Sequence, residues 1–245
     1  MSFQAGLVTG SPLMPSLWLD QHPEAQVPGY LGWSGPMACT ESKVFRAWIA
    51  EFMTALLNDY AIDGIIWDEP KSEGLVSAHP ETISKFGASP TRQNMEDGFI
   101  SFLSELTAHC RSIRPDLTIT LFNSAKSTEY FTSNSVRIPG LDYAGYDGNL
   151  CRQSFFHEKP KWHKYRLESV YDRTLAECRA AKVGTFALVE NMLIPREAIP
   201  EYRDNLAAFL QKLRFDHLAL YYYAHNNEDP ETVHKITRDL MQKNL

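Results

Sequence analysis

The sequence predicts an α/β protein, a TIM-type (β/α) barrel in which parallel strands alternate with helices. Two observations predict this fold. Short apolar runs alternate with longer amphipathic segments, and each apolar run ends in polar or acidic residues. The length of 245 residues also fits one barrel domain. No repeat, low-complexity tract or linker divides the chain, so we expect a single domain over residues 1–245.

The clearest unit of this alternation covers residues 40–70. Thr40 or Ser42 can cap a helix. The helix then carries an apolar stripe at helical spacing, formed by Val44, Trp48, Ile49, Phe52, Ala55, Leu56 and Tyr60. A strand is expected over Ile62–Trp67. It ends in Asp68, Glu69 and Pro70, where the proline cannot continue the ladder.

The same pattern recurs along the rest of the chain. The remaining helices are expected at Met95–Ile113, Leu167–Ala181, Glu201–Leu213 and Pro230–Leu240. The remaining strands are expected at Leu117–Phe122, Leu141–Tyr146, Thr185–Val189 and His217–Tyr223. In barrels the active site lies at the carboxyl ends of the strands, so the polar residues that follow these strands are the first candidates for a site.

The N-terminal region fits a complete barrel poorly. About six strands are recognisable, whereas a full barrel has eight. Residues 1–43 offer only weak strands such as Ala5–Val8 and Ser16–Leu19, and Gly29–Gly35 suggests either a mobile aromatic loop or a surface turn. We expect a barrel that is incomplete at its N-terminus, a fragment of a longer barrel, or disguised first strands. An open doubly wound sheet is the rival fold, but no glycine-rich turn follows a first strand.

Composition and charge exclude several classes of protein. A net charge of −6 and a pI near 5.8 argue against a general nucleic-acid binder and against attachment to an anionic membrane. No export signal is recognisable, which predicts a cytoplasmic location. Four cysteines lie far apart without close pairing, so we expect reduced thiols rather than a zinc site, and no cofactor.

Three carboxylates are the candidate catalytic residues. Asp68 and Glu69 are adjacent at a strand end, where mutual repulsion favours a raised pKa for one of them and thus a general acid. Glu190 follows the strand Thr185–Val189. Two carboxyl groups across a barrel mouth are what glycoside hydrolysis requires, one as acid and the other as nucleophile or base. A solvated acidic loop is the alternative interpretation at each position.

The segment Cys39–Pro70 resembles the third helix and fourth strand of glycoside-hydrolase barrels. Its motif is Asp63-Gly64 followed by Trp67-Asp68-Glu69-Pro70. The resemblance is to the retaining clan that has an Asn-Glu after strand four and a second glutamate after strand seven. It implies that Glu69 is the acid/base and Glu190 the nucleophile. Asp68 stands where that clan has asparagine, and other barrel hydrolases use an aspartate there as nucleophile, so Asp68 is the alternative nucleophile.

Polar and aromatic residues near the predicted strand ends are the candidates for binding a carbohydrate substrate. Aromatic faces stack on sugar rings, while polar groups bond the hydroxyls. Each of these residues has a core or loop role as its alternative. They are Trp33, Trp67, Asn123, Asp142, Tyr146, Asp147, Tyr222, His225 and Asn226.

Two other functions stay open at this point. A non-catalytic carbohydrate-binding barrel would keep the pocket without a competent acid pair. A magnesium-assisted lyase or isomerase would use Asp68, Glu69, Asp142 and Glu190 as oxygen ligands. Glycoside hydrolysis is the function that the carboxylate pattern favours.

Overall fold

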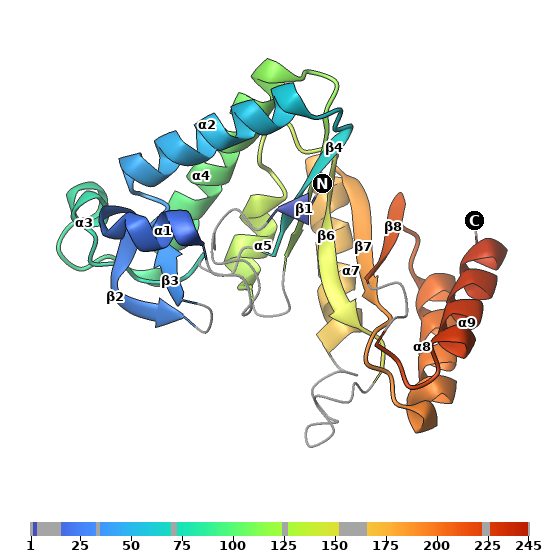
Figure 1. The fold of residues 1–245 in the computed structure, drawn as a ribbon. Helices are drawn as coiled ribbons and strands as arrows, with labels where there is room; N and C mark the ends of the chain where they lie inside the picture. The colour runs from blue at the N-terminus through green and yellow to red at the C-terminus, as the bar shows by residue number, and fades with distance from the viewer. Residues whose placement is uncertain are drawn as a thin grey trace. The chain divides into compact units, whose positions relative to one another are not determined.

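The protein is described from a computed structural model, which describes residues 2–3, 16–32, 35–69, 73–123, 127–151, 166–221 and 226–244. The main sheet has the strand order β1 (Ser2–Phe3), β4 (Gly64–Asp68), β5 (Thr118–Asn123), β6 (Tyr143–Asn149), β7 (Gly184–Glu190), β8 (His217–Tyr221). Figure 1 labels these strands except β5. The chain divides into two compact units, Met1–Leu121 with Ser127–Asp142, and Phe122–Lys126 with Tyr143–Leu245. We describe each unit by itself.

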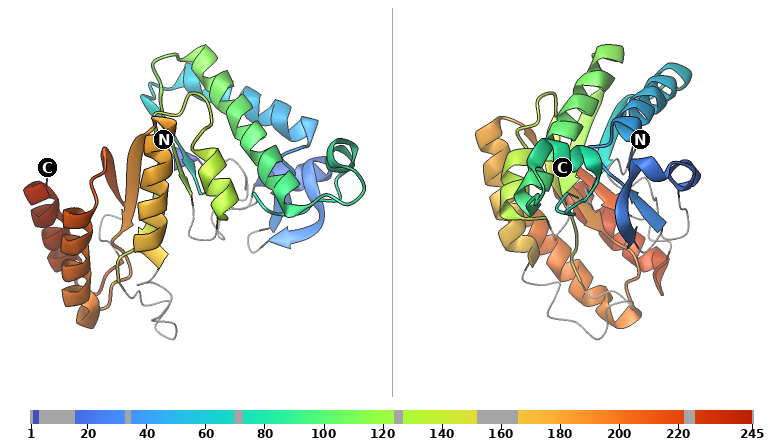
Figure 2. Two further views of the ribbon diagram at one scale, coloured as in Figure 1. Left: turned by 180° about the vertical axis from the view of Figure 1, so that it is seen from behind. Right: turned by 90° about the vertical axis from the view of Figure 1, so that its left-hand side faces the viewer.

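The first unit contains the N-terminal strands and the two longest helices that the structure describes, α2 and α4. Its elements are β1 (Ser2–Phe3), α1 (Leu17–Gln21), η1 (Pro23–Ala25), β2 (Gln26–Gly32), β3 (Gly35–Ala38), α2 (Lys43–Asp59), β4 (Gly64–Asp68), α3 (Pro80–Phe86), α4 (Arg92–Ile113) and α5 (Glu129–Ser135). Strand β5 (Thr118–Asn123) ends in the second unit. Strands β1 and β4 pair in parallel, and β2 and β3 form an antiparallel pair. Figure 2 shows α2 and α4 lying side by side.

The N-terminal region differs from the sequence-based expectation. Ser16–Leu19 was expected as a weak strand, but α1 begins at Leu17 because the Ser16 hydroxyl accepts a hydrogen bond from the Leu19 amide at 3.2 Å. Of the segment Gly29–Gly35, expected as a loop or turn, residues 29–32 end β2 and Gly35 begins β3, and residues 33–34 lie outside the described residues. The other suggested strand, Ala5–Val8, lies outside the described residues. These short elements were obscured because they lack the alternation of the later strands.

Helix α2 confirms the predicted helix and its Ser42 cap, whose hydroxyl accepts from the Phe45 amide at 3.4 Å. The buried stripe of α2 is offset from the expected one. Its buried residues, spaced four apart, are Phe45, Ile49, Met53 and Leu57. Val44 and Phe52 of the expected stripe are 41% and 39% exposed. Two adjacent apolar stripes exist on this helix, and only packing against the rest of the unit selects between them.

The second unit contains the C-terminal strands and the helices that cover one face of them. Its elements are β6 (Tyr143–Asn149), α7 (Arg166–Ala181), β7 (Gly184–Glu190), η3 (Arg196–Ala198), α8 (Ile199–Lys212), β8 (His217–Tyr221) and α9 (Pro230–Asn244). Strands β6, β7 and β8 are parallel neighbours. This confirms the predicted alternation of parallel strands and helices. Helices α8 and α9 lie side by side (Figure 2), and the Tyr202 and Thr237 hydroxyls join them at 2.8 Å.

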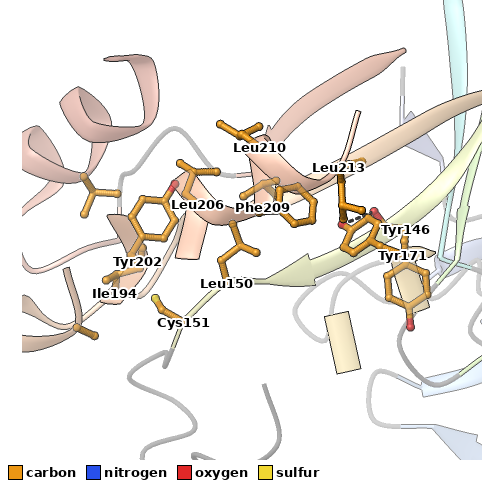
Figure 3. Close-up of a cluster of buried hydrophobic side chains, with 14 of the residues drawn as sticks. Tyr146, Leu150, Cys151, Tyr171, Ile194, Tyr202, Leu206, Phe209, Leu210 and Leu213 are labelled. Atoms are coloured by element: carbon orange, nitrogen blue, oxygen red, sulfur yellow. Dashed lines mark hydrogen bonds between the residues drawn. The ribbon is translucent and has the colours of Figure 1, made fainter. Parts of the chain in front are cut away.

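The core of the second unit lies between the sheet and helices α7, α8 and α9 (Figure 3). Tyr171 of α7 and Phe209 of α8 meet edge to face, with ring centroids 4.9 Å apart. Tyr146, Ala187 and Val189 contribute from the sheet. Because side chains alternate along a strand, these three mark the helix-covered face of the sheet.

The opposite face carries the carboxylates, and we call it the glutamate face. Leu188 and Glu190 alternate with Ala187 and Val189 along β7, so their side chains lie on the face opposite the helices. The register pairs Asp147 with Leu188 and Tyr221 with Glu190, which places Asp147 and Tyr221 on that same face. Below the strand ends the glutamate face is apolar and aromatic. Phe122 of β5 stacks on Phe186 with ring centroids 5.8 Å apart.

Gly145 packs closely against the Phe186 backbone on this face, so a larger side chain there is expected to destabilise the protein. A Cβ at this position would overlap the carbonyl oxygen of its register partner Phe186 and approach the Phe186 Cβ to 2.9 Å. We therefore expect Gly145→Ala to lower the free energy of unfolding by about 1–3 kcal/mol, as overpacking does. Urea unfolding measures this change. Adding Phe186→Leu to Gly145→Ala should not restore stability, because the backbone carbonyl of Phe186 is the nearest obstacle. Restored stability in this double variant, or a Gly145→Ala midpoint equal to that of the wild type, would contradict the close contact between Gly145 and Phe186.

Candidate active site

The end of β4 places Asp68 and Glu69 in the first unit. Ile65 and Trp67 alternate with Ile66 and Asp68 along this strand, and the former two are each 1% exposed. The Trp67 indole donates to the Thr107 hydroxyl of α4 at 3.0 Å. Trp67 therefore faces α4. Because side chains alternate along a strand, the half-buried Asp68 lies on the opposite face of β4.

Glu69 has an unusual backbone conformation. Its φ is +36°, and it is one of three non-glycine residues with positive φ among those the structure describes. In this region an L side chain crowds the following carbonyl group, at a cost of about 1–2 kcal/mol. Strain of this kind concentrates at functional sites, because surrounding structure must hold it.

Glycine and alanine variants at residue 69 test this strain. Both remove the carboxylate, but only glycine adopts positive φ without strain. We expect Glu69→Gly to be more stable than Glu69→Ala by about 1 kcal/mol in urea unfolding. The matched pair at exposed Glu51, inside α2, should show the opposite order, with alanine more stable by about 0.5–1 kcal/mol. The same order at both positions would refute backbone strain at Glu69.

The second unit holds Glu190 and Asp147 at the ends of β7 and β6. Glu190 is the last residue of β7 and pairs in register with Tyr221, the last residue of β8, which is 43% exposed. Asp147 lies two residues before the end of β6 and pairs with Leu188. Both carboxylates are half-buried and belong to the glutamate face. The structure thus groups Glu190, Asp147 and Tyr221 within one unit.

A buried tyrosine lies close to these two carboxylates. Burial first, and then the charge of Asp147 and, more weakly, that of Glu190, raise the pKa of Tyr171 well above its ordinary value. The Tyr171 hydroxyl therefore stays protonated and donates to the backbone carbonyls of Tyr146, at 3.2 Å, and Leu188, at 3.5 Å. It braces β6 and β7 just before they end. The sequence analysis missed Tyr171 because the only signal there was an aromatic at helical spacing.

Asn191 is a second residue that the sequence analysis did not single out. It directly follows Glu190, is 1% exposed, and its amide donates to the Tyr221 carbonyl at 2.7 Å. Asn227 holds the same loop, since its side chain donates to the Asn191 carbonyl at 2.8 Å and accepts from the Ile194 amide at 2.7 Å. Among the residues that the structure describes, none hydrogen-bonds to the buried Asn191 Oδ1. Its adjacency to Glu190 was the signal in the sequence.

The structure corrects the position of Asp142. The sequence analysis placed it at the strand ends with Asp147, but β6 begins only at Tyr143, so Asp142 precedes the strand. Its Oδ2 accepts from the Ile119 amide at 2.7 Å and from Arg111 at 2.6 Å. Asp216, which precedes β8, likewise accepts from the Thr185 amide at 2.7 Å. Both aspartates join the beginnings of neighbouring strands, at the edge of the sheet away from the strand ends.

The other predicted substrate contacts lie in several environments. Tyr146 is 2% exposed in the core on the helix-covered face, and Trp67 is equally a core residue of its unit. Asn123 ends β5 and is fully buried, whereas Asn226 is exposed. Three further predicted contacts lie outside the described residues: Trp33, Tyr222 and His225.

No group of three or more His, Cys, Asp or Glu side chains in the described part of the chain is arranged to hold a metal ion. Asp142, one of the four proposed magnesium ligands, is engaged by Arg111 instead. No helix within the described ranges is both long and apolar enough to cross a bilayer.

Solved structures with a similar fold are glycoside hydrolases. The glycoside hydrolase domain of PelA from Pseudomonas aeruginosa matches with a TM-score of 0.56 and 14% identity, over 90% of this chain and 77% of that one. A β-galactosidase from Marinomonas ef1 has a TM-score of 0.61 and 10% identity, over 99% and 49% of the two chains. An endo-β-1,4-mannanase from Thermotoga petrophila has a TM-score of 0.52 and 9% identity, over 84% and 51%. No protein-family model and no curated protein matches the sequence.

These matches define the class of fold. The chain has an α/β fold with a parallel sheet, similar to that of barrel glycoside hydrolases, and it spans about half the length of two of the similar structures. At identities of 9–15% the similarity establishes the fold and leaves the activity to the chemistry of the site.

Proposed function

We propose that this protein hydrolyses glycosidic bonds, with Glu69 as acid/base and Glu190 as nucleophile. The observation that carries the proposal is that Glu190 is the last residue of β7 and Glu69 directly follows β4, in a chain whose fold is similar to that of glycoside hydrolases. Active sites of β/α barrels form at such ends. The strained backbone of Glu69 adds support, because strain of this kind is concentrated at functional sites.

The second unit offers the surroundings that a nucleophilic glutamate needs. Tyr171 and Asn191 fix the strand ends on either side of Glu190. The buried acceptor Asn191 Oδ1 has the chemistry to bond a sugar hydroxyl, and exposed Tyr221 beside Glu190 offers a ring for stacking. Carbohydrate is therefore the substrate class that we propose.

Hydrolysis of a panel of nitrophenyl glycosides and polysaccharides tests this function. We expect release of nitrophenol or of reducing ends from at least one substrate. A 2-deoxy-2-fluoro analogue of that substrate should form a covalent adduct on Glu190, located by peptide mass spectrometry, because a nucleophilic carboxylate forms a glycosyl–enzyme intermediate. An adduct on Asp68 would transfer the nucleophile role to that residue.

Two results would contradict the proposal, and each would support one of the alternative functions. Sugar binding without turnover at any pH would support a non-catalytic carbohydrate-binding barrel. Activity that disappears with EDTA and returns with Mg²⁺ would support a metal-assisted lyase or isomerase.

A further inference from the structure

A buried carboxyl group lies in the loop that follows β4. Glu73 is four residues after Glu69 in the sequence and is only 5% exposed. Its Oε1 accepts a hydrogen bond from the Ser127 hydroxyl at 3.1 Å. Ser127 is four residues after Asn123, where β5 ends. One hydrogen bond therefore connects the loops that follow β4 and β5.

A second buried carboxylate lies beside this connection. Glu96 of α4 is 2% exposed, and its Oε1 accepts from the Thr128 hydroxyl at 2.9 Å and from Arg92 at 3.0 Å. Thr128 also caps α5, since its hydroxyl accepts from the Phe131 amide at 3.0 Å. Adjacent residues 127 and 128 are thus held by two different buried acids.

The charges around Glu73 do not compensate its burial. Desolvation raises the pKa of Glu73, and the neighbouring charge of Glu96 raises it further. The Glu73 backbone amide, the Ser127 hydroxyl and the Arg92 charge act in the opposite direction without reversing the shift. Arg92 reaches this loop closely, because a Cβ on Gly74 would lie 2.7 Å from its Nε.

We infer that Glu73 is a positioning residue that, through Ser127, clasps the loop after β4 to the loop after β5 and thereby holds the backbone at Glu69. We name Glu73, Ser127, Glu96, Thr128 and Arg92 the carboxyl clasp. Protonation of Glu73 avoids the desolvation of its charged form and its repulsion with Glu96, and these two effects outweigh the Ser127 hydrogen bond, which favours the charged form. Its effect on catalysis rests on the proposed function of Glu69, whereas its effect on stability does not.

Because Glu73 binds its proton with different affinity in the folded and unfolded chains, its contribution to stability depends on pH. The folded-state pKa of Glu73 lies above the ordinary value of 4.5, so the folded protein binds the proton more tightly than the unfolded chain does. The contribution of Glu73 to stability is then fully present below pH 4.5 and is lost as the pH rises through the folded-state pKa. Glutamine imitates the protonated acid and does not titrate.

The first test compares urea midpoints of the Glu73→Gln variant and the wild type from pH 4 to pH 9. We expect the variant to gain stability relative to the wild type as the pH rises above about 4.5, and the difference to level off. The control Glu51→Gln changes an exposed carboxylate of α2 and should change the urea midpoint little. A flat Glu73→Gln difference would overturn the clasp. Ser127→Ala, which keeps both acids, should lower the midpoint; no change would also count against it.

The second test measures hydrolysis at a pH and temperature where all variants are folded. Glu73→Ala is expected to lower kcat by about 10- to 100-fold with KM little changed, since loose positioning of a catalytic group has effects of this size. Glu73→Gln should restore most of kcat. Equal kcat values for wild type and Glu73→Ala would refute the positioning role. If the wild type hydrolyses no glycoside, the proposed function fails, and the pH-dependent midpoints still decide the clasp.

Discussion

Replacing Glu190 by glutamine is expected to lower kcat for glycoside hydrolysis by about 10⁴-fold or more, since removing a nucleophile leaves only the catalysis that the remaining groups supply. The amide keeps the size of the side chain at the end of β7 but can neither attack the anomeric carbon nor form the covalent intermediate. Because the sugar contacts remain, the Kd for substrate should change little. Stopped assays with a nitrophenyl glycoside, together with calorimetric binding, measure both quantities.

Glu69→Gln gives the complementary pattern if Glu69 is the acid/base. Loss of the acid should slow substrates with poor leaving groups most, since activated leaving groups need little protonation. The exposed glutamates Glu51 of α2 and Glu231 of α9 supply matched Glu→Gln controls, one in each unit, and should leave kcat unchanged. If Glu190→Gln kept full activity and Asp68→Asn were inactive, Asp68 rather than Glu190 would be the nucleophile.

Phe209→Ala is expected to remove about 3–5 kcal/mol from the free energy of unfolding, a large part of the total for a domain of this size. Phe209 is 6% exposed, and its ring centroid lies 4.9 Å from that of Tyr171 (Figure 3). The Phe215 ring stacks on it at a centroid distance of 5.3 Å. Deleting the Phe209 ring leaves a cavity between α7, α8 and the sheet. Because Tyr171 braces the ends of β6 and β7, turnover should also fall at temperatures where the variant is still folded.

Urea unfolding followed by circular dichroism measures this change in stability. Phe209→Leu retains most of the apolar volume and should cost clearly less than the alanine variant. Gln211→Ala, on the exposed side of the same helix, should lie within about 0.5 kcal/mol of the wild type. A Phe209→Ala midpoint equal to that of Gln211→Ala would mean that the core is not assembled as described.

Much of the fold could be predicted because apolar periodicity is a local property. The strands ending at Asp68, Asn123 and Glu190 were expected within one or two residues of their observed bounds. Helix α2 and its Ser42 cap were also expected. The N-terminal elements were not, since α1 and the β2–β3 pair are short and carry no repeated pattern. Asp142 was misplaced because β6 begins and ends later than its apolar run suggested.

By itself the sequence determined the alternation of strands and helices and the positions of Asp68, Glu69 and Glu190 at or directly after strand ends. Tertiary structure decided which apolar stripe of α2 is buried and that Trp67 and Tyr146 belong to the core. It also decided that Tyr171 and Asn191 hold strand ends in the second unit, and that Glu73 is buried against Ser127 in the first. The physical reason is that periodicity is encoded by neighbours in the chain. Burial, backbone strain and the pKa of a carboxyl group depend on residues that only the folded chain brings together.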